Sequence, residues 1–168
     1  MAEETHGTGD GSPSRAVSEW LMANGWFPAR DIGAEAEELV RIRAEDARRQ
    51  GVTLSPLPSA SRIVHVYGGL TLPWPGAGRA ALIVKPTVGY DGDAAAIIEL
   101  AAALGTRLFP VGYERSEYGI VLVDEHGRFF MLHHTGGYYM GKDEFDAFSR
   151  LLRSEAYPDA EDSFDETR

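Results

Sequence analysis

Cysteine is absent from this sequence of 168 residues. Its absence excludes thiolate metal sites, cysteine nucleophiles and a disulfide framework. A domain of about this size buries roughly 70% of its unfolded surface, so neither disulfides nor a metal is required for stability. We therefore expect a single domain with one hydrophobic core.

Long apolar runs are also missing from the chain. No stretch approaches the ~18 apolar residues of a membrane-spanning helix. Residues 1–15 contain no basic segment followed by an apolar one, which is the pattern of a secretory signal. These two absences predict a cytoplasmic protein that has no membrane partner.

Positive charge is scarce, and the formal net charge is −10. The negative charge is concentrated at the ends: residues 1–14 carry three acids and no base, and residues 154–168 carry six acids and one arginine. The segment between them, residues 15–153, has a net charge of only −2. Acidic and polar ends of this composition cannot bury enough apolar surface to order themselves. We expect a disordered N-terminal tail, a folded domain over 15–153 and an acidic C-terminal tail. Because no basic face is visible, we expect no nucleic-acid partner.

The common catalytic motifs are missing as well. GxSxG, HExxH, a Walker loop and paired cysteines do not occur. The chain therefore lacks the signatures of the commonest hydrolase, metalloprotease, phosphate and zinc chemistries. Asp124 and Glu125 lie in the segment DEHG and are better explained as turn residues than as a general acid and base. The sequence predicts neither an enzyme nor a bound cofactor.

Two adjacent histidines, His133 and His134, stand out within the segment FFMLHHTGGYYMG. Consecutive side chains of a strand point to opposite faces, so we expect the two rings to diverge and not to share a metal ion. We also expect Gly136 and Gly137 to form a turn that points Tyr138 outward into a contact loop. A small metalloenzyme that uses His133 with other histidines is an alternative interpretation.

Apolar periodicity and strong helix formers predict four helices, over residues 14–25, 34–51, 92–105 and 141–155. Asp91 or Asp93 is expected to cap the third helix. The buried faces are expected to hold Ile97, Ile98, Ala101 and Leu104 in the third helix, and Phe145, Phe148, Leu151 and Leu152 in the fourth.

Five strands are predicted where β-branched and aromatic residues gather, over residues 70–74, 79–87, 106–114, 118–124 and 128–134. The last two are joined by DEHG, whose Asp and Gly suit a type I turn with a glycine bulge, and they form a hairpin. The secondary structure of residues 58–70 is not decided by these patterns. Their β-branched residues favour a strand, while Ile63, Val64 and Tyr67 fit one face of a helix equally well.

Four glycine-containing segments place Trp or Tyr beside a charged residue: GWFPAR, VGYDGD, VGYERSEYG and TGGYYMGKD. Trp and Tyr offer a large contact area together with a hydrogen-bonding group, and they are frequent in binding hot spots. The alternative is that the tyrosines are ordinary half-buried residues at strand ends. The candidates for partner binding are Trp26, Arg30, Tyr90, Asp91, Tyr113, Glu114, Glu117, His133, Tyr138 and Tyr139.

The order of several short motifs over residues 15–153 resembles the third family of the SUKH superfamily. The shared pattern is a tryptophan-bearing helix followed by GW-x-P-x-R, a segment that ends in Gly-Gly-Leu, a Leu-Gly before a P-x-G strand, and a hairpin with D-x-x-G. The matching residues are Trp20, Gly25, Trp26, Pro28, Arg30, Gly68, Gly69, Leu70, Leu104, Gly105, Pro110, Gly112, Asp124 and Gly127. Each motif is short, and their joint order and spacing carry the resemblance.

This resemblance implies an α+β fold in which an antiparallel sheet of about five strands packs with flanking helices. It also favours a helix for residues 58–70. Family members are known as bacterial immunity proteins, which bind and neutralise a cognate polymorphic toxin and carry no catalytic residues. The implied partner is therefore a toxin protein that is blocked by occlusion. The alternative is a regulatory module that binds a host protein, because the wider superfamily includes such modules.

Overall fold

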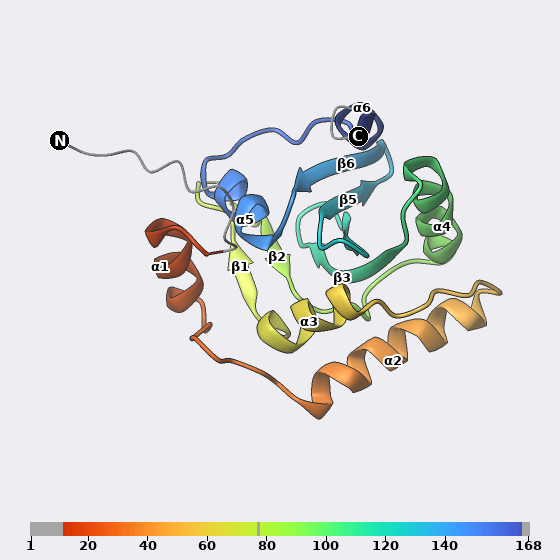
Figure 1. Cartoon of the computed structure of the whole chain (residues 1–168), viewed down its shortest axis with the longest axis horizontal. Coiled ribbons are helices and arrows are strands. Elements are labelled where there is room, and N and C mark those ends of the chain that lie inside the picture. Colours follow the sequence, from red (N-terminus) through yellow and green to blue (C-terminus); the bar gives the residue numbers. More distant parts are fainter. Residues whose placement is uncertain (1–11, 77, 166–168) are drawn as a thin grey trace.

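The computed structural model describes residues 12–76 and 78–165. Within these residues six helices and six strands follow one another as shown in Figure 1. The helices are α1 (Arg15–Ala23), α2 (Ala34–Arg49), α3 (Pro58–Tyr67), α4 (Asp93–Leu104), α5 (Glu144–Leu152) and α6 (Ala160–Asp165). The strands are β1 (Thr71–Pro73), β2 (Ala81–Ile83), β3 (Leu108–Glu114), β4 (Ile120–Asp124), β5 (Phe129–His133) and β6 (Gly136–Gly141). Among the described helices, none combines the length and the apolar character of a membrane span.

The strands form one antiparallel sheet in which each strand pairs with the next along the chain, from β1 to β6. In Figure 1 the sheet is curled, with α2 and α3 below it, α1 and α4 toward opposite sides, and α6 beyond β6. This arrangement confirms the α+β class and the antiparallel sheet. It adds one strand to the expected five.

The additional strand, β6, is formed by the glycine-rich segment that we expected to be a contact loop, so that expectation is wrong. Two of its glycines lie too close to helices to carry a side chain. A Cβ on Gly137 would lie 2.7 Å from Leu100 Cδ1 of α4, and a Cβ on Gly141 would lie 2.5 Å from the Ala147 nitrogen of α5. Glycine weakens strands in general, but it also marks places where another element approaches the backbone closely. In β6 the close packing of α4 and α5 against the glycines outweighs the low strand propensity of glycine.

Residues 58–70, which fitted a strand or a helix, form α3 and the turn after it. Ile63, Val64 and Tyr67 are buried, as the helical pattern predicts. The helix ends at Gly68, where a Cβ would lie 2.3 Å from the Val64 carbonyl oxygen. A close backbone approach therefore requires glycine at this position, and the helical interpretation is confirmed.

Helix α4 begins differently from the expectation. Its N-cap is Gly92, with a φ of 90°, and no side chain caps the helix. The prediction that Asp91 or Asp93 caps α4 is therefore wrong. Asp93 is instead the first helical residue, and its carboxylate lies 2.7 Å from the guanidinium of Arg43.

The buried face of α4 is centred on Ile97, Leu100 and Leu104, which recur at intervals of three and four residues. Ile97 and Leu104 were predicted to be buried, and this is confirmed. Ile98 is 43% exposed, so its predicted burial is wrong. Successive residues of a helix are turned by about 100°, which carries Ile98 away from the face that its neighbour buries.

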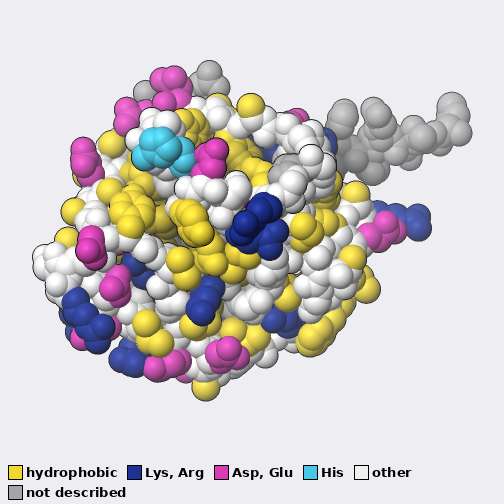
Figure 2. All heavy atoms as spheres, turned by 180° about the vertical axis from the view of Figure 1, so that it is seen from behind, with side chains coloured by type: hydrophobic (Ala, Val, Ile, Leu, Met, Phe, Trp, Pro, Cys, Tyr) yellow, Lys and Arg dark blue, Asp and Glu magenta, His cyan; other side chains and the backbone are white. Residues whose placement is uncertain are grey.

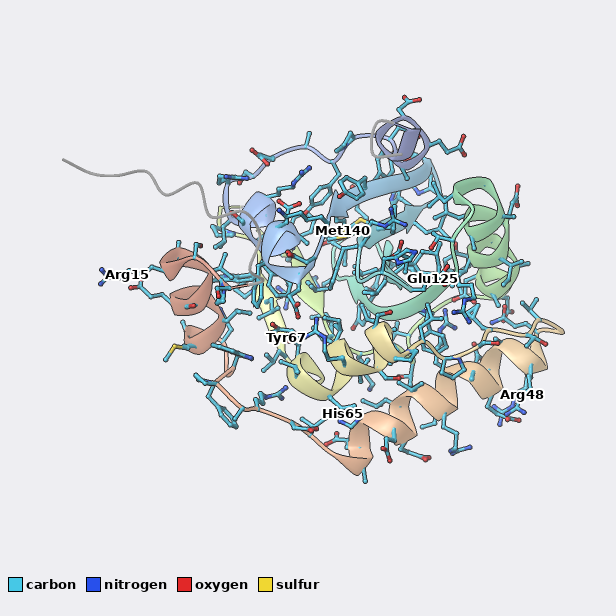
Figure 3. All side chains as sticks on the ribbon, in the orientation of Figure 1. Arg15, Arg48, His65, Tyr67, Glu125 and Met140 are labelled. Carbon is cyan, nitrogen blue, oxygen red and sulfur yellow. The ribbon has the colours of Figure 1, made fainter. Side chains whose placement is uncertain are left out.

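Helix α5 places Phe148 at the centre of an aromatic cluster. Its ring meets the rings of Trp20, Tyr67 and Phe129 edge-on, with centroid distances of 5.5, 5.4 and 6.2 Å. Edge-to-face pairs of this kind add to the stabilisation that comes from burial alone. In Figure 3 Tyr67 lies inside the molecule, whereas Arg15 projects from α1 into solvent. Phe148 thus joins α1, α3, β5 and α5.

Part of the acidic C-terminal segment packs against the sheet. The backbone N–H of Tyr139 donates to the Pro158 carbonyl at 2.9 Å, Tyr138 and Asp159 form a β-bridge, and Ala160 is fully buried. The expectation that acidic composition leaves this segment unordered is wrong for these residues, because backbone pairing with the outer edge of β6 holds them in place. Of the tail expected over residues 1–14, residues 1–11 lie outside the described residues.

Candidate functional site

An open hollow of about 670 Å³ lies at one end of the sheet, bordered by the β3–β4 loop and the β5–β6 turn. Figure 2 shows histidine and acidic side chains next to each other on this side of the molecule, close to hydrophobic groups. The described residues that line the hollow are Trp74, Ala80, Glu114, Ser116, Glu117, Gly119, Met131, His133, His134, Thr135, Tyr138 and Tyr157. Four of the ten residues predicted to bind a partner, Glu114, Glu117, His133 and Tyr138, are among them.

The register of the sheet explains why residues distant in sequence meet here. It aligns one residue from each of four strands in a single row: Gly112, Val121, Met131 and Tyr138. Side chains alternate between faces along a strand, so the residues two positions farther along β3 and β5 share the face of this row. Those residues are Glu114 and His133, and both reach the hollow.

Glu114 is a buried carboxylate, only 4% exposed. It accepts hydrogen bonds from the Ser116 N–H at 2.8 Å, from the Ser116 hydroxyl at 2.7 Å and from the Glu117 N–H at 2.7 Å. The β3–β4 loop therefore folds around this side chain, much as a loop folds around an anion. The bonds fix the loop and hold Glu117 at the rim.

His133 is the centre of a chain of polar contacts at the rim. Its Nε2 lies 3.0 Å from Glu117 Oε2, outside hydrogen-bond alignment, and its Nδ1 lies 3.0 Å from Thr135 Oγ1. The hydroxyl of Thr135 is in turn 2.6 Å from the Tyr138 hydroxyl. The contacts connect the β3–β4 loop to β5 and β6, so the rim is one connected polar surface.

The two histidines lie side by side, so the expectation that they point to opposite faces is wrong. Strand β5 ends at His133, and His134 belongs to the following turn. Strand alternation no longer applies in the turn, and the ring centroids are only 3.9 Å apart, with the planes tilted by 46°. Even so, within the described part of the chain no three His, Asp or Glu side chains are grouped so that they would hold a metal ion.

Besides His133 Nε2, the hollow has two buried polar atoms for which the described residues provide no hydrogen-bond partner, namely Trp74 Nε1 and Tyr157 Oη. Their rings meet edge-on with centroids 6.2 Å apart. Burial raises the pKa of the Tyr157 phenol, so its hydroxyl keeps its proton. A buried donor without an acceptor costs about 1 to 3 kcal/mol. The hollow therefore has hydrogen-bonding groups that the described residues leave unpaired.

Tyr118 stands beside the hollow in a strained conformation. It is 63% exposed and has a φ of 59°, in the left-handed region that bulky residues rarely occupy. Its ring is stacked on that of Tyr113, with an interplanar angle of 8° and centroids 6.2 Å apart. Such strain costs about 1 to 3 kcal/mol and is found preferentially at functional sites.

Trp26 and Arg30, two of the predicted partner-binding residues, do not line the hollow. The guanidinium of Arg30 donates to the carbonyl of Val66 at 2.9 Å and to that of Gly68 at 2.7 Å. Trp26 packs against the hydrophobic core. Arg30 attaches the α1–α2 connection to the C-terminal end of α3, and Trp26 contributes to the core, which is sufficient to explain their types.

The remaining predicted residues also lie outside the lining of the hollow. Tyr90 and Asp91 are exposed in the segment before α4. Tyr139 is only 9% exposed, and the guanidinium of Arg150 lies over its ring, 5.5 Å from the centroid. Tyr113 does not line the hollow, but its ring stacks on that of Tyr118, which lies beside the hollow.

Several lining residues were not among the ten predicted partner-binding residues: Trp74, Ser116, His134, Thr135 and Tyr157. Trp74 ends a predicted strand and has no neighbouring motif that would indicate a site. Tyr157 is an aromatic residue in an otherwise acidic segment, and that contrast was the one available signal. Contacts between distant segments place both residues, and no local pattern encodes those contacts.

Comparison with known proteins gives one match. No curated protein and no solved structure matches the chain. The model of the SUKH-3 immunity protein family matches residues 13–154, which is most of the chain. The match agrees with the motif order, the helix α3 and the antiparallel sheet described above, and the chain belongs to the SUKH-3 immunity protein family.

Proposed function

We propose that this protein acts in the cytoplasm as an immunity protein that neutralises a cognate bacterial toxin by occlusion, without catalysis. The observation that carries this proposal is the convergence of four predicted contact residues, from three strands and a loop, on one open hollow. A hollow with aromatic walls and a charged rim provides both contact area and hydrogen bonds for side chains of a partner protein.

The exposed Tyr118 extends the proposed contact surface beyond the hollow. Tyrosine is enriched in binding hot spots because it combines a large, rigid ring with a hydroxyl group. Its left-handed backbone presents the ring to solvent instead of burying it. We take the surface formed by Tyr113, Tyr118 and the rim of the hollow as the toxin-binding surface.

The histidine contacts support binding more than catalysis. Thr135, His133 and Glu117 follow the hydroxyl–imidazole–carboxylate order of a catalytic triad. However, Thr135 is only two residues from His133, in the turn that follows it, and its hydroxyl also contacts Tyr138. The Glu117 side chain is 71% exposed, whereas the carboxylate that orients a catalytic imidazole is buried. The arrangement is a hydrogen-bonded rim.

The test uses the product of the gene adjacent to this one as the toxin, in a pull-down and in a protection assay. We expect the wild-type protein to bind the toxin and to protect cells that express it. Tyr118→Ala and Glu117→Ala should leave the melting temperature nearly unchanged, because both side chains are exposed. Each should weaken toxin binding by about 2 kcal/mol, the cost of losing a hot-spot residue.

A control variant is available on α2. Ile42 is 40% exposed and does not line the hollow, so Ile42→Ala should bind the toxin like wild type. Replacing His133 and His134 together with glutamine separates occlusion from catalysis. Because His133 lies on the proposed contact surface, we expect any loss of protection in this double variant to follow from weaker toxin binding. Loss of protection with intact folding and intact toxin binding would show that the histidines do chemistry, and failure of the wild-type protein to bind the toxin would overturn the proposal.

A further inference from the structure

The described lining of the hollow contains two acidic residues, Glu114 and Glu117, and neither lysine nor arginine. The segment from residue 15 to residue 153 has a net charge of only −2, so this acidity is local to the hollow. Local acidic surfaces on a binding face select partners that present positive charge at the same place. The charge of the hollow therefore restricts what fits into it.

Glu114 differs from every other buried carboxylate of the described chain. The others each have an arginine partner: Asp93 with Arg43 at 2.7 Å, Asp124 with Arg128 at 2.6 Å, and Glu144 with Arg62 at 2.6 Å. Among the described residues Glu114 has no ion pair, and its partners are the N–H and O–H groups of the β3–β4 loop. A buried charge surrounded only by dipoles gains stability from a cation supplied from outside.

The walls of the hollow suit the same kind of guest. Trp74, Tyr138 and Tyr157 all line it, and a cation over the face of a tryptophan or tyrosine is attracted by the ring. Trp74 Nε1 has no acceptor among the described residues, and a backbone carbonyl next to a basic side chain would supply one. A basic residue within a polypeptide offers both groups together.

We infer that the hollow receives an arginine or lysine side chain of the toxin. Its positive charge lies against Glu114 and Glu117, and its alkyl stem lies against the aromatic walls. The inference rests on the proposed function, because the toxin supplies the side chain. A volume of about 670 Å³ accommodates a guanidinium or ammonium group together with its stem. Arginine stacks on aromatic rings and binds carboxylates with two parallel hydrogen bonds, whereas lysine acts as a point charge.

The first experiment titrates the full-length, isotope-labelled protein with three small probes in an NMR measurement. The probes are N-acetyl-arginine amide, N-acetyl-lysine amide and N-acetyl-citrulline amide, the last being an uncharged analogue of the first. We expect the two basic probes to shift the indole N–H resonance of Trp74 saturably, with citrulline causing no saturable shift. The resonance of Trp26, which does not line the hollow, serves as the internal control.

Charge-removing variants locate the binding site. Glu114→Gln and Glu117→Gln keep the side-chain volume, and each should weaken binding of the basic probes and of the toxin by at least about tenfold, because a charge-assisted contact is lost. Glu35→Gln removes the same charge from an exposed position at the start of α2 and should stay within about twofold of wild type. Glu117 is exposed, so its variant reports on binding even if Glu114→Gln weakens the fold.

The outcomes separate this inference from the proposed function. Equal shifts with citrulline, or no saturable shift with either basic probe, would overturn the inference. It would also be overturned if the wild-type protein bound the toxin and both hollow variants bound it equally well, and the proposed function would then stand. A protein that binds the basic probes but not the toxin would refute the proposed function and leave the hollow with a preference for basic side chains.

Discussion

Arg43 of α2 and Asp93 of α4 form an ion pair in the interior, with side-chain exposures of 1% and 0% and a distance of 2.7 Å. Asp46 accepts a further hydrogen bond from Arg43, and Gln50 donates one to Asp93. Gly89 leaves room for it, since a Cβ there would lie 2.0 Å from an Asp93 carboxylate oxygen. This pair fixes α2 against the start of α4.

Arg43→Ala should destabilise the protein by about 3 to 5 kcal/mol, because it leaves the Asp93 carboxylate buried and without a charged partner. Urea unfolding followed by circular dichroism measures this change in the free energy of unfolding. The control lies on the same helix, where Arg41 pairs with Glu38 at 2.6 Å in solvent. Arg41→Ala should cost less than about 1 kcal/mol. Equal costs for the two variants would show that burial gives the interior pair no special role.

The residues of the hollow show how far single positions are predictable from sequence. Glycine-flanked tyrosines beside charges, which are typical of contact surfaces, drew attention to Glu117 and Tyr138, and both residues line the hollow. The burial of Glu114 was not predictable, since it depends on the loop folding back over the carboxylate. Tyr157 was missed because the composition of its segment predicted a solvated tail, whereas pairing with the edge of β6 orders the neighbouring residues.

At the scale of elements, periodic patterns predicted four of the six described helices, left α3 open, and predicted neither α6 nor the glycine-rich strand. The four predicted helices repeat an apolar face or consist of strong helix formers over several turns, and such segments are recognisable in the sequence. Strand β6 contains three glycines in six residues, and no residue-by-residue pattern distinguishes it from a loop. What makes it a strand is the approach of α4 and α5 to its glycines, which depends on the tertiary fold.

Helix α5 depends on Phe148 for its attachment to three other elements. Phe148→Ala should lower the free energy of unfolding by about 3 to 5 kcal/mol, the usual cost of removing a buried aromatic ring. Phe145 lies on the same helix but is only partly buried, so Phe145→Ala should cost clearly less. Chemical denaturation of both variants tests this order. If Phe148→Ala lowered the free energy of unfolding less than Phe145→Ala does, the aromatic cluster would not be a principal support of the fold.

For the molecule as a whole, the topology is the simplest that six antiparallel strands allow, since each strand pairs with its neighbour in sequence. The hairpin of β4 and β5 was predictable from its turn residues, and the resemblance to the SUKH superfamily implied the antiparallel sheet. The outer edges are protected in different ways: β1 has only three residues and ends in Pro73, and residues 158–159 lie along β6. Short or covered edges discourage pairing between molecules.

Buried tyrosines make the stability of the whole fold sensitive to alkaline pH. Burial raises the pKa of Tyr67 far above its ordinary value, with a further contribution from the negative charge of Glu144. Tyr67 is 2% exposed. In the unfolded chain a tyrosine loses its proton near pH 10, whereas the folded protein keeps the proton on Tyr67. Above that pH the folded state binds more protons than the unfolded state, so stability falls as the pH rises.

We therefore expect the free energy of unfolding to decrease from about pH 10 upward, with Tyr67 contributing about 1.4 kcal/mol per pH unit. Urea unfolding at a series of alkaline pH values measures this slope. Tyr67→Phe removes the titrating group and should reduce the slope by that amount, although loss of the hydroxyl lowers stability at neutral pH. Tyr118→Phe, at an exposed position, should leave the slope unchanged. If the two variants had the same alkaline slope as wild type, Tyr67 would not be the group that couples the fold to proton concentration.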